Sequence, residues 1–302
     1  MKEKRTKVDH NYSIVPSVMR KHPKLALNLI WSFVRMFATR VQEYRRKDNV
    51  THKLNLMSFR LTPLCNLSCV MCGQRGDKGT LKGQFAAEES KKIVPLEDYK
   101  RLIDDVARER PVIYIWGGEP FLYPQLCELV EYIQSKGMIV SVNTNGTFLE
   151  RYAERIVAGK WRSVFVSLDG FEDVNDKIRG SGSYRRVVDG FAAIKREKEK
   201  QKSDLPFMGV VTTVSNQNYL YLDQLAEAAA KDFGLAWHIF NLGTYTNDNV
   251  VAMHTKVMTE KLDTPLHCLE GYNTGYNDGI DGQKLFDILN RIHTMPTGYP
   301  MI

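Results

Sequence analysis

With 302 residues, of which 43% are hydrophobic and 25% charged, the chain can bury a substantial core and has the composition of a folded globular protein. This balance excludes a disordered chain and a membrane-spanning one. The five cysteines have no regular spacing outside one short stretch, and no secretory leader pattern follows Met1. We therefore expect no disulfide scaffold and a reducing, cytoplasmic setting.

The net charge of +7 is concentrated near the N-terminus. Residues 1–50 contain twelve Lys and Arg against four acidic residues, a balance of +8, which leaves about −1 on the rest of the chain. A nucleic-acid-binding domain would be expected to spread basic side chains over its folded surface. We expect no nucleic-acid partner and assign residues 1–50 to a basic N-terminal extension.

Within this extension, LALNLIWSFVRMFATRVQEYRRK (25–47) predicts an amphipathic helix. Its narrow polar stripe is formed by Asn28, Ser32, Arg35, Thr39, Gln42 and Arg46. The apolar run is broken by Arg35 and is shorter than the roughly 20 residues that a membrane span needs. Two alternatives remain for residues 20–48. The helix packs against the main domain or another chain, or it lies on an anionic membrane surface as a peripheral anchor.

From residue 54 onward, short β-branched or aromatic runs alternate with helical patterns. The predicted strands are 54–62, 111–118, 138–146, 163–170, 207–215 and 235–243. Their spacing suits right-handed βαβ units and a parallel sheet, and therefore an α/β fold. Because six units are too few for the usual eight-stranded barrel, we expect an open, partial barrel or a doubly wound sheet.

The chain thus divides into three predicted parts. The barrel core occupies residues 51–243, after the N-terminal extension. Residues 244–302 form a C-terminal extension, which we interpret as a lid over the barrel mouth or a truncated linker. A helical pattern near KLFDILNRIH (284–293) indicates that part of it is ordered.

Unusual residues follow four of the strands. Cysteines come after the first, Gly117-Gly118-Glu119 after the second, Asn143–Gly146 after the third and Ser167–Gly170 after the fourth. In parallel α/β barrels the loops at the carboxyl ends of the strands build the active site. The sequence predicts one site there, large enough for a cofactor and a substrate.

Three cysteines, Cys65, Cys69 and Cys72, have the spacing Cys-x3-Cys-x2-Cys. Thiolates bind zinc or iron–sulfur clusters, and structural zinc usually takes four protein ligands. No fourth ligand is close by in the sequence. Three thiolates on a four-iron cluster would leave one iron open for a small ligand, but the triplet alone leaves coincidence or zinc with a remote ligand as alternatives.

Taken in order, CNLSCVMC, WGGEP, VNTNG and SLDG resemble the motifs of radical S-adenosylmethionine (SAM) enzymes over residues 54–243. The resemblance implies a (β/α)6 partial TIM barrel behind the N-terminal amphipathic helix. It also implies a [4Fe–4S] cluster held by Cys65, Cys69 and Cys72, with SAM on the unique iron. An electron from the cluster would cleave SAM, and the 5′-deoxyadenosyl radical would abstract hydrogen from a substrate.

The same resemblance implies SAM contacts after the second, third and fourth strands. Gly117 and Gly118 would let the backbone approach SAM, and Glu119 would accept a hydrogen bond from its ammonium group. Asn145 and Ser167 are candidates for ribose or carboxylate contacts. The alternative for both is a local cap at a strand end.

Further candidates lie beyond the fourth strand. Asp169 either faces the substrate or starts a helix. Arg179, in NDKIRG, either pairs with the SAM carboxylate or lies on a solvated loop, and Asn216 is a weaker candidate. Met71 stands where many family members have an aromatic residue, a departure that leaves cluster binding intact.

Two cysteines lie outside the triplet. Cys127 falls on the apolar face of a predicted helix and is expected to be a buried hydrophobe. Cys268 follows the sixth strand, and we expect it to have no role in a cluster. SLDG and DKIRG resemble the branch that modifies peptides or small metabolites and often carries a C-terminal (SPASM-type) domain with auxiliary clusters. A single cysteine there gives no indication of that domain.

The leading hypothesis is therefore an enzyme that uses a [4Fe–4S] cluster and SAM on a peptide or small-metabolite substrate. A low-potential electron donor of the flavodoxin or ferredoxin type would reduce the cluster. Two alternatives are a non-catalytic iron–sulfur scaffold subunit that keeps the fold and a zinc-stabilised structural domain.

Overall fold

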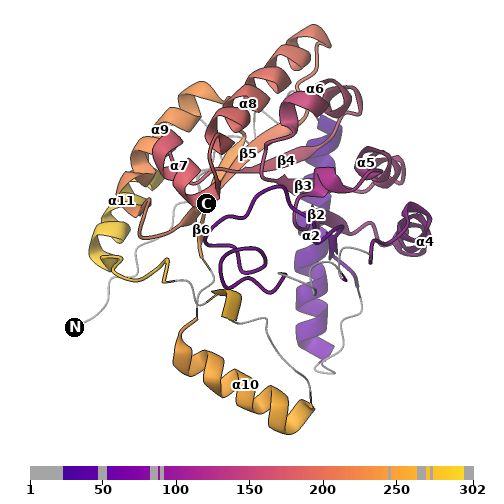
Figure 1. The fold of residues 1–302 in the computed structure, drawn as a ribbon. Helices are drawn as coiled ribbons and strands as arrows, with labels where there is room; N and C mark the ends of the chain where they lie inside the picture. The colour runs from indigo at the N-terminus through magenta and orange to yellow at the C-terminus, as the bar shows by residue number, and fades with distance from the viewer. Residues whose placement is uncertain are drawn as a thin grey trace.

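The computed structural model describes residues 23–46, 53–81, 88, 92–243, 246–263, 270–272 and 275–295. Six strands pair in parallel in the order β1-β2-β3-β4-β5-β6. They are β1 (Leu56–Arg60), β2 (Val112–Trp116), β3 (Val140–Thr144), β4 (Ser163–Ser167), β5 (Phe207–Val214) and β6 (Trp237–Leu242). Because β1 and β6 are edge strands and the order follows the chain, the sheet is an open barrel, not a doubly wound sheet (Figure 1). The predicted (β/α)6 partial TIM barrel is confirmed.

Each strand lies inside its predicted run, and β3 and β4 end within the first residues of the polar clusters predicted there. In β4, for example, the strand stops at Ser167, and Leu168–Gly170 belong to the loop. The clusters therefore leave the sheet at its carboxyl edge, where a loop can turn polar groups toward a ligand.

Helices cover the outer face of the sheet because alternate strand residues point outward. In β2, Ile113 and Ile115 are fully buried in the core beneath the helices. The covering helices are α4 (Leu96–Val106), α5 (Leu126–Ser135), α6 (Leu149–Ala158), α8 (Ser183–Lys200) and α9 (Leu222–Asp232). α6 and α8 approach closely because a Cβ on Gly190 would lie 2.7 Å from the Leu149 side chain.

Aromatic side chains line the inner face of the sheet at mid-strand. The ring centroid of Phe165 lies 6.4 Å from that of Tyr114 and 5.2 Å from that of Trp237. Gly209 in β5 pairs with Trp237 in β6 and leaves room for its indole. A Cβ on Gly209 would lie 1.8 Å from the indole nitrogen of Trp237. These rings occupy the middle of the inner face and leave the carboxyl edge as the place for chemistry.

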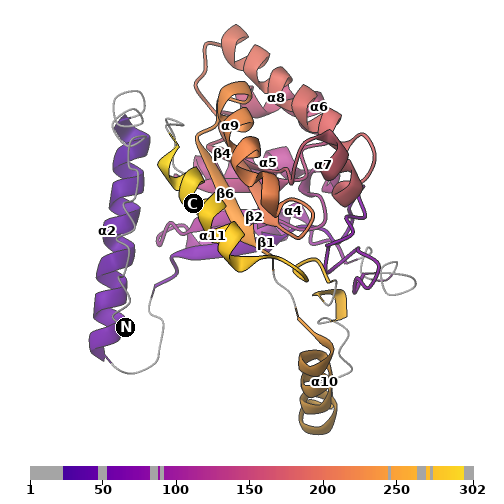
Figure 2. The ribbon, with the colours of Figure 1, turned by 90° about the vertical axis from the view of Figure 1, so that its left-hand side faces the viewer.

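Several elements were not predicted from the sequence. They are α7 (Glu172–Arg179), α10 (Asp248–Leu262) and the short 3-10 helices η1 (Pro120–Leu122) and η3 (Glu270–Tyr272). The 3-10 helix η2 (Tyr219–Tyr221) directly precedes α9. α10 has no buried residue and projects away from the barrel in both views (Figures 1 and 2). By contrast, α11 (Gly282–Thr294), which includes the predicted helical pattern, packs on α9 through Ile288 and Ile292. This part of the C-terminal extension belongs to the core.

The N-terminal helix α2 (Pro23–Arg46) is present where the sequence predicts it. In Figure 2 it stands apart from the helices that cover the sheet. Within the described residues, no helix combines the length and the hydrophobicity that crossing a bilayer requires.

Candidate active site

The loop that carries the cysteines is joined to the Gly-Gly-Glu segment by backbone hydrogen bonds. Gly118 N donates to Thr62 O over 2.7 Å, and Glu119 N donates to Leu64 O over 2.7 Å. A Cβ on Gly118 would lie 2.0 Å from Leu64 O, and one on Gly117 would lie 2.7 Å from Thr62 O. These glycines are therefore required by the close approach of the cysteine loop, a reason that the sequence did not reveal. Their contact with SAM stays a prediction.

Replacing Gly118 by Ala is expected to lower the free energy of unfolding by about 2–4 kcal/mol, because the loop must move and lose backbone hydrogen bonds. Urea denaturation measures this loss. Gly282→Ala is the matched control, since a Cβ there meets nothing within 4 Å at the start of α11. It should be neutral or stabilise by up to about 1 kcal/mol. Equal urea midpoints for the two variants would contradict the role given to Gly118.

Glu119 is fully buried and joins the ends of β2 and β3. Its carboxylate accepts hydrogen bonds from Phe121 N (3.2 Å), Thr144 Oγ1 (2.7 Å) and Asn145 N (2.8 Å). Burial raises the pKa of Glu119 to about 7, although these three donors lower it. Three protein donors thus orient the carboxylate that the resemblance assigns to the SAM ammonium group, and that assignment stays a prediction.

Asn145 connects the end of β3 to the cysteine loop. Its Oδ1 accepts from Thr147 N (3.0 Å) and Thr147 Oγ1 (2.7 Å). Its Nδ2 donates to Asn66 Oδ1 over 2.8 Å and lies 3.7 Å from Cys65 Sγ. The sequence interpretation missed Asn66 and Thr144, although both lie within the CNLSC and NTNG motifs. Their side chains hold these motifs together.

A buried ion pair lies on the other side of the loop. Arg179 Nε is 2.7 Å from Asp169 Oδ2, and the side chains are 9% and 0% exposed. Asp169 Oδ1 also accepts from Thr213 N over 2.8 Å. α7 begins at Glu172, so Asp169 does not start it, and the alternative of a solvated loop for Arg179 is wrong.

The positive charge of Arg179 affects the pKa of Cys69. Burial raises the pKa of Cys69 to about 11, and the nearby guanidinium opposes this rise. Burial lowers the pKa of Arg179, but Asp169 and Cys69 more than compensate, so its pKa is raised. A backbone bond from Val70 N to Ile178 O (2.9 Å) holds the loop against the end of α7.

The three thiols have the chemistry that a four-iron cluster requires. Cys65, Cys69 and Cys72 are free of disulfides and half-buried, and Leu67 N lies 3.5 Å from Cys65 Sγ as a donor. Donors to sulfur and a nearby cation favour bound thiolates. In the part of the chain that the structure describes, no three His, Cys, Asp or Glu side chains are grouped tightly enough for a single metal ion. A cluster instead binds each thiolate through a different iron.

The remaining candidates are Ser167, Cys127 and Cys268. Ser167 ends β4 half-buried, on the inner side shared with Phe165. Cys127 is 5% exposed in the main core, which confirms its expected role, whereas Cys268 lies outside the described residues. Among the described residues, the Ser167 side chain forms no hydrogen bond with the cysteine loop, so its contact with SAM stays a prediction.

Asn216 fastens the C-terminal extension to the end of β5. Its Nδ2 donates to Gly275 O (3.2 Å) and Asp278 O (3.1 Å). Nearby, the Tyr272 ring lies over Gly73, where a Cβ would come within 2.6 Å of it. This part of the extension therefore covers the rim of the site beside the last cysteine.

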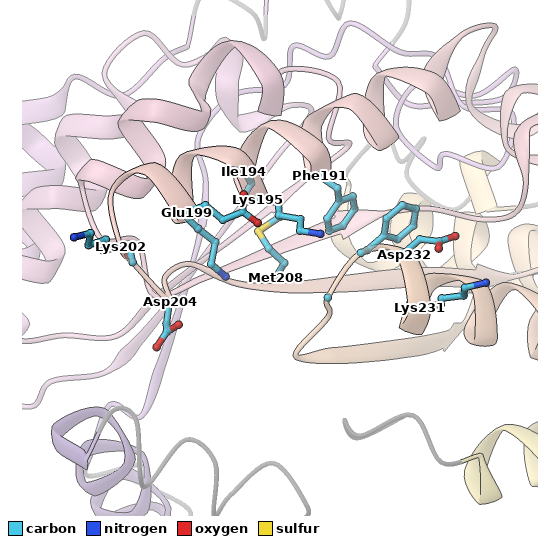
Figure 3. A pocket seen from close by; sticks show the side chains of 13 residues that line it. Phe191, Ile194, Lys195, Glu199, Lys202, Asp204, Met208, Lys231 and Asp232 are labelled. Carbon is cyan, nitrogen blue, oxygen red and sulfur yellow. The ribbon is translucent and has the colours of Figure 1, made fainter.

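A second concave region lies on the opposite edge of the sheet. It has a volume of about 560 Å³ and is bordered by the C-terminal ends of α8 and α9. Figure 3 shows Phe191 and Met208 at its base and lysines such as Lys195 and Lys231 around it. Because Lys202 and Asp204 precede β5, this groove lies at the amino ends of the strands, away from the cysteines.

Comparison with known proteins identifies the family of this chain. Residues 59–228, more than half of the chain, match the family model of the Radical SAM superfamily. The AdoMet-dependent heme synthase of Methanosarcina barkeri (strain Fusaro / DSM 804) is 30% identical over 64% of this chain and 52% of the relative. The mycofactocin maturase MftC of Mycobacterium tuberculosis (strain ATCC 25618 / H37Rv) is 30% identical over 58% of this chain and 41% of the relative.

Solved structures agree on the fold. Streptococcus suis SuiB bound to S-adenosylmethionine has a TM-score of 0.55 and 12% identity, covering 82% of this chain and 59% of that chain. The chain spans about half the length of the curated relatives that it matches. The chain belongs to the Radical SAM superfamily, whose members use a [4Fe–4S] cluster and S-adenosylmethionine.

Proposed function

We propose that the protein cleaves SAM reductively and uses the resulting 5′-deoxyadenosyl radical to abstract hydrogen from a peptide or small metabolite. The observation that carries this proposal is the junction of motifs at one sheet edge. The cysteine loop is bonded to the Gly-Gly-Glu segment, to Asn145 and to the end of α7. A scaffold subunit would have no need of the Gly-Gly-Glu segment next to its cluster.

The protein's own residues have defined tasks in this proposal. Cys65, Cys69 and Cys72 would hold the [4Fe–4S] cluster, which supplies the low-potential electron for SAM cleavage when bound. The Asn145 amide orients Cys65 through the 3.7 Å contact to its sulfur. Arg179, buried beside Cys69, offsets the negative charge of thiolates.

SAM would lie at the ends of β2, β3 and β4. Its contacts would be the backbone of Gly117 and Gly118 and the side chains of Glu119, Asn145 and Ser167, with Asp169 and Arg179 beyond them. The rings of Tyr114, Phe165 and Trp237 fill the middle of the inner face. A substrate would therefore bind at the rim and not deep within the barrel, near residues 270–272 and 275–278.

The substrate class rests on the relatives. Their names include a heme synthase and a mycofactocin maturase, and SuiB has been solved with the precursor peptide SuiA at a TM-score of 0.53. Both peptides and small metabolites fit this range. The electron donor would be of the flavodoxin or ferredoxin type, and a reducing cytoplasm suits free thiols of this kind.

The test is anaerobic reconstitution with iron and sulfide, followed by dithionite and SAM, with 5′-deoxyadenosine measured by mass spectrometry. We expect 5′-deoxyadenosine to form with the wild-type chain and not with a Cys65/Cys69/Cys72→Ala control. A reconstituted protein that holds its cluster but never releases 5′-deoxyadenosine would support the scaffold alternative instead.

A further inference from the structure

The N-terminal helix α2 exposes a row of large apolar side chains. Six large side chains on it are at least 41% exposed: Leu27, Ile30, Trp31, Val34, Phe37 and Tyr44. They recur at steps of three, four and seven, so they share one side of the helix. The rings of Trp31 and Phe37 are 68% and 70% exposed. Scattered exposed hydrophobic residues are common, but a continuous row of this size marks a binding surface.

The opposite side of α2 is the less exposed one. Thr39, a member of the predicted polar stripe, is only 2% exposed, and Met36 and Glu43 are half-buried. On a helical wheel these three lie across from the row of exposed apolar residues. The most buried of the described side chains on α2 therefore lies on its polar side, and the six apolar side chains stay exposed.

The charges around the apolar row indicate what covers it. Arg40, Arg45 and Arg46 are exposed, and the helix has no acidic residue in its first turn. The whole stretch of residues 1–50 carries +8. A second copy of this chain would bring an equal positive charge to the contact and be repelled. Anionic lipid headgroups would be attracted, and Trp, Phe and Tyr side chains favour the boundary between headgroups and acyl chains.

We propose that α2 is an in-plane anchor that binds the surface of an anionic lipid bilayer. Leu27, Trp31, Val34 and Phe37 enter the headgroup boundary, and Arg45 and Arg46 contact lipid phosphates. The inference goes beyond the proposed SAM chemistry and does not depend on it, because the surface is separate from the cysteine loop. Its consequence is that the barrel works at a membrane surface.

The experiment is flotation of the full-length chain with vesicles of phosphatidylcholine alone or of phosphatidylcholine with phosphatidylglycerol. We expect binding to the anionic vesicles, weakened by salt, and little binding to the neutral ones. The double variant Trp31→Ala/Phe37→Ala should lower the partition coefficient by about tenfold or more, because two rings no longer enter the boundary. Arg45→Glu/Arg46→Glu should lower it by about tenfold as well.

Phe286→Ala is the matched control. Phe286 is 53% exposed on α11. Its replacement removes an exposed ring from another surface and should leave vesicle binding unchanged. Urea midpoints equal to wild type would show that the α2 variants are folded. Absence of binding to anionic vesicles would overturn the proposal. So would a dimer in gel filtration that Trp31→Ala/Phe37→Ala dissociates, since the face would then join two copies.

Discussion

Replacing Cys65, Cys69 and Cys72 together by Ala is expected to abolish iron binding and SAM cleavage completely. Wild-type chain should retain about four irons after anaerobic reconstitution, because three thiolates suffice to hold a four-iron cluster with one open site. The triple variant loses every protein ligand to the cluster. Iron analysis and visible absorption measure the cluster, and 5′-deoxyadenosine release measures the chemistry.

Cys127→Ala provides the matched control for this result. Cys127 is also a free cysteine, but it is buried in the core between the sheet and α5. Its replacement should cost about 1 kcal/mol of stability through a small cavity and leave the iron content unchanged. A triple variant that still held about four irons would show that other residues ligate the cluster, and the site would have to be placed elsewhere.

Single substitutions should separate the roles of the three thiols. Cys65 is approached by Leu67 N and Asn145 Nδ2, whereas Cys69 lies in the field of Arg179. Asn145→Ala should therefore loosen Cys65 alone. The structure thus gives Cys65 a neighbour at the end of β3 and Cys69 a neighbour in α7.

The location of the site could be predicted from the sequence, because parallel strands bring their carboxyl ends to one edge whatever the lengths of the helices between them. The contacts between the motifs could not be predicted from the sequence. The sequence predicted that Glu119 accepts a hydrogen bond from SAM. In the structure its carboxylate is buried and already accepts hydrogen bonds from donors at the end of β3 and in η1. That arrangement depends on distances across the sheet, which spacing along the chain does not contain.

The same limit applies to the helices. Periodicity predicted the two faces of α2, but a pattern does not say which side chains become buried, and Thr39 of the polar stripe is only 2% exposed. α10 was missed because its apolar residues bury nothing and form no strong stripe. α11 was predicted because Ile288 and Ile292 recur at the spacing of a packed helix face.

Removing one member of the buried ion pair should be the most destabilising single change outside the core. Asp169→Ala is expected to lower the free energy of unfolding by about 3–5 kcal/mol, because it leaves the Arg179 guanidinium buried without its carboxylate. Arg179→Ala should cost a similar amount by leaving Asp169 buried. In the double variant neither charge is stranded, so the loss should be smaller than the sum of the two single losses.

Arg185→Ala is the matched control, since its Nε lies 3.1 Å from Asp189 on the surface of α8 with the Arg side chain 72% exposed. An exposed pair one helical turn apart contributes about 0.5 kcal/mol or less. Urea denaturation of all four variants gives the comparison. Because α7 also holds the cysteine loop through Ile178 O, Asp169→Ala should lose iron faster than Arg185→Ala does. Equal stability and equal iron retention in Asp169→Ala and Arg185→Ala would mean that the Asp169–Arg179 pair neither supports α7 nor fixes the cysteine loop. The role left for Arg179 would then be the contact with the SAM carboxylate.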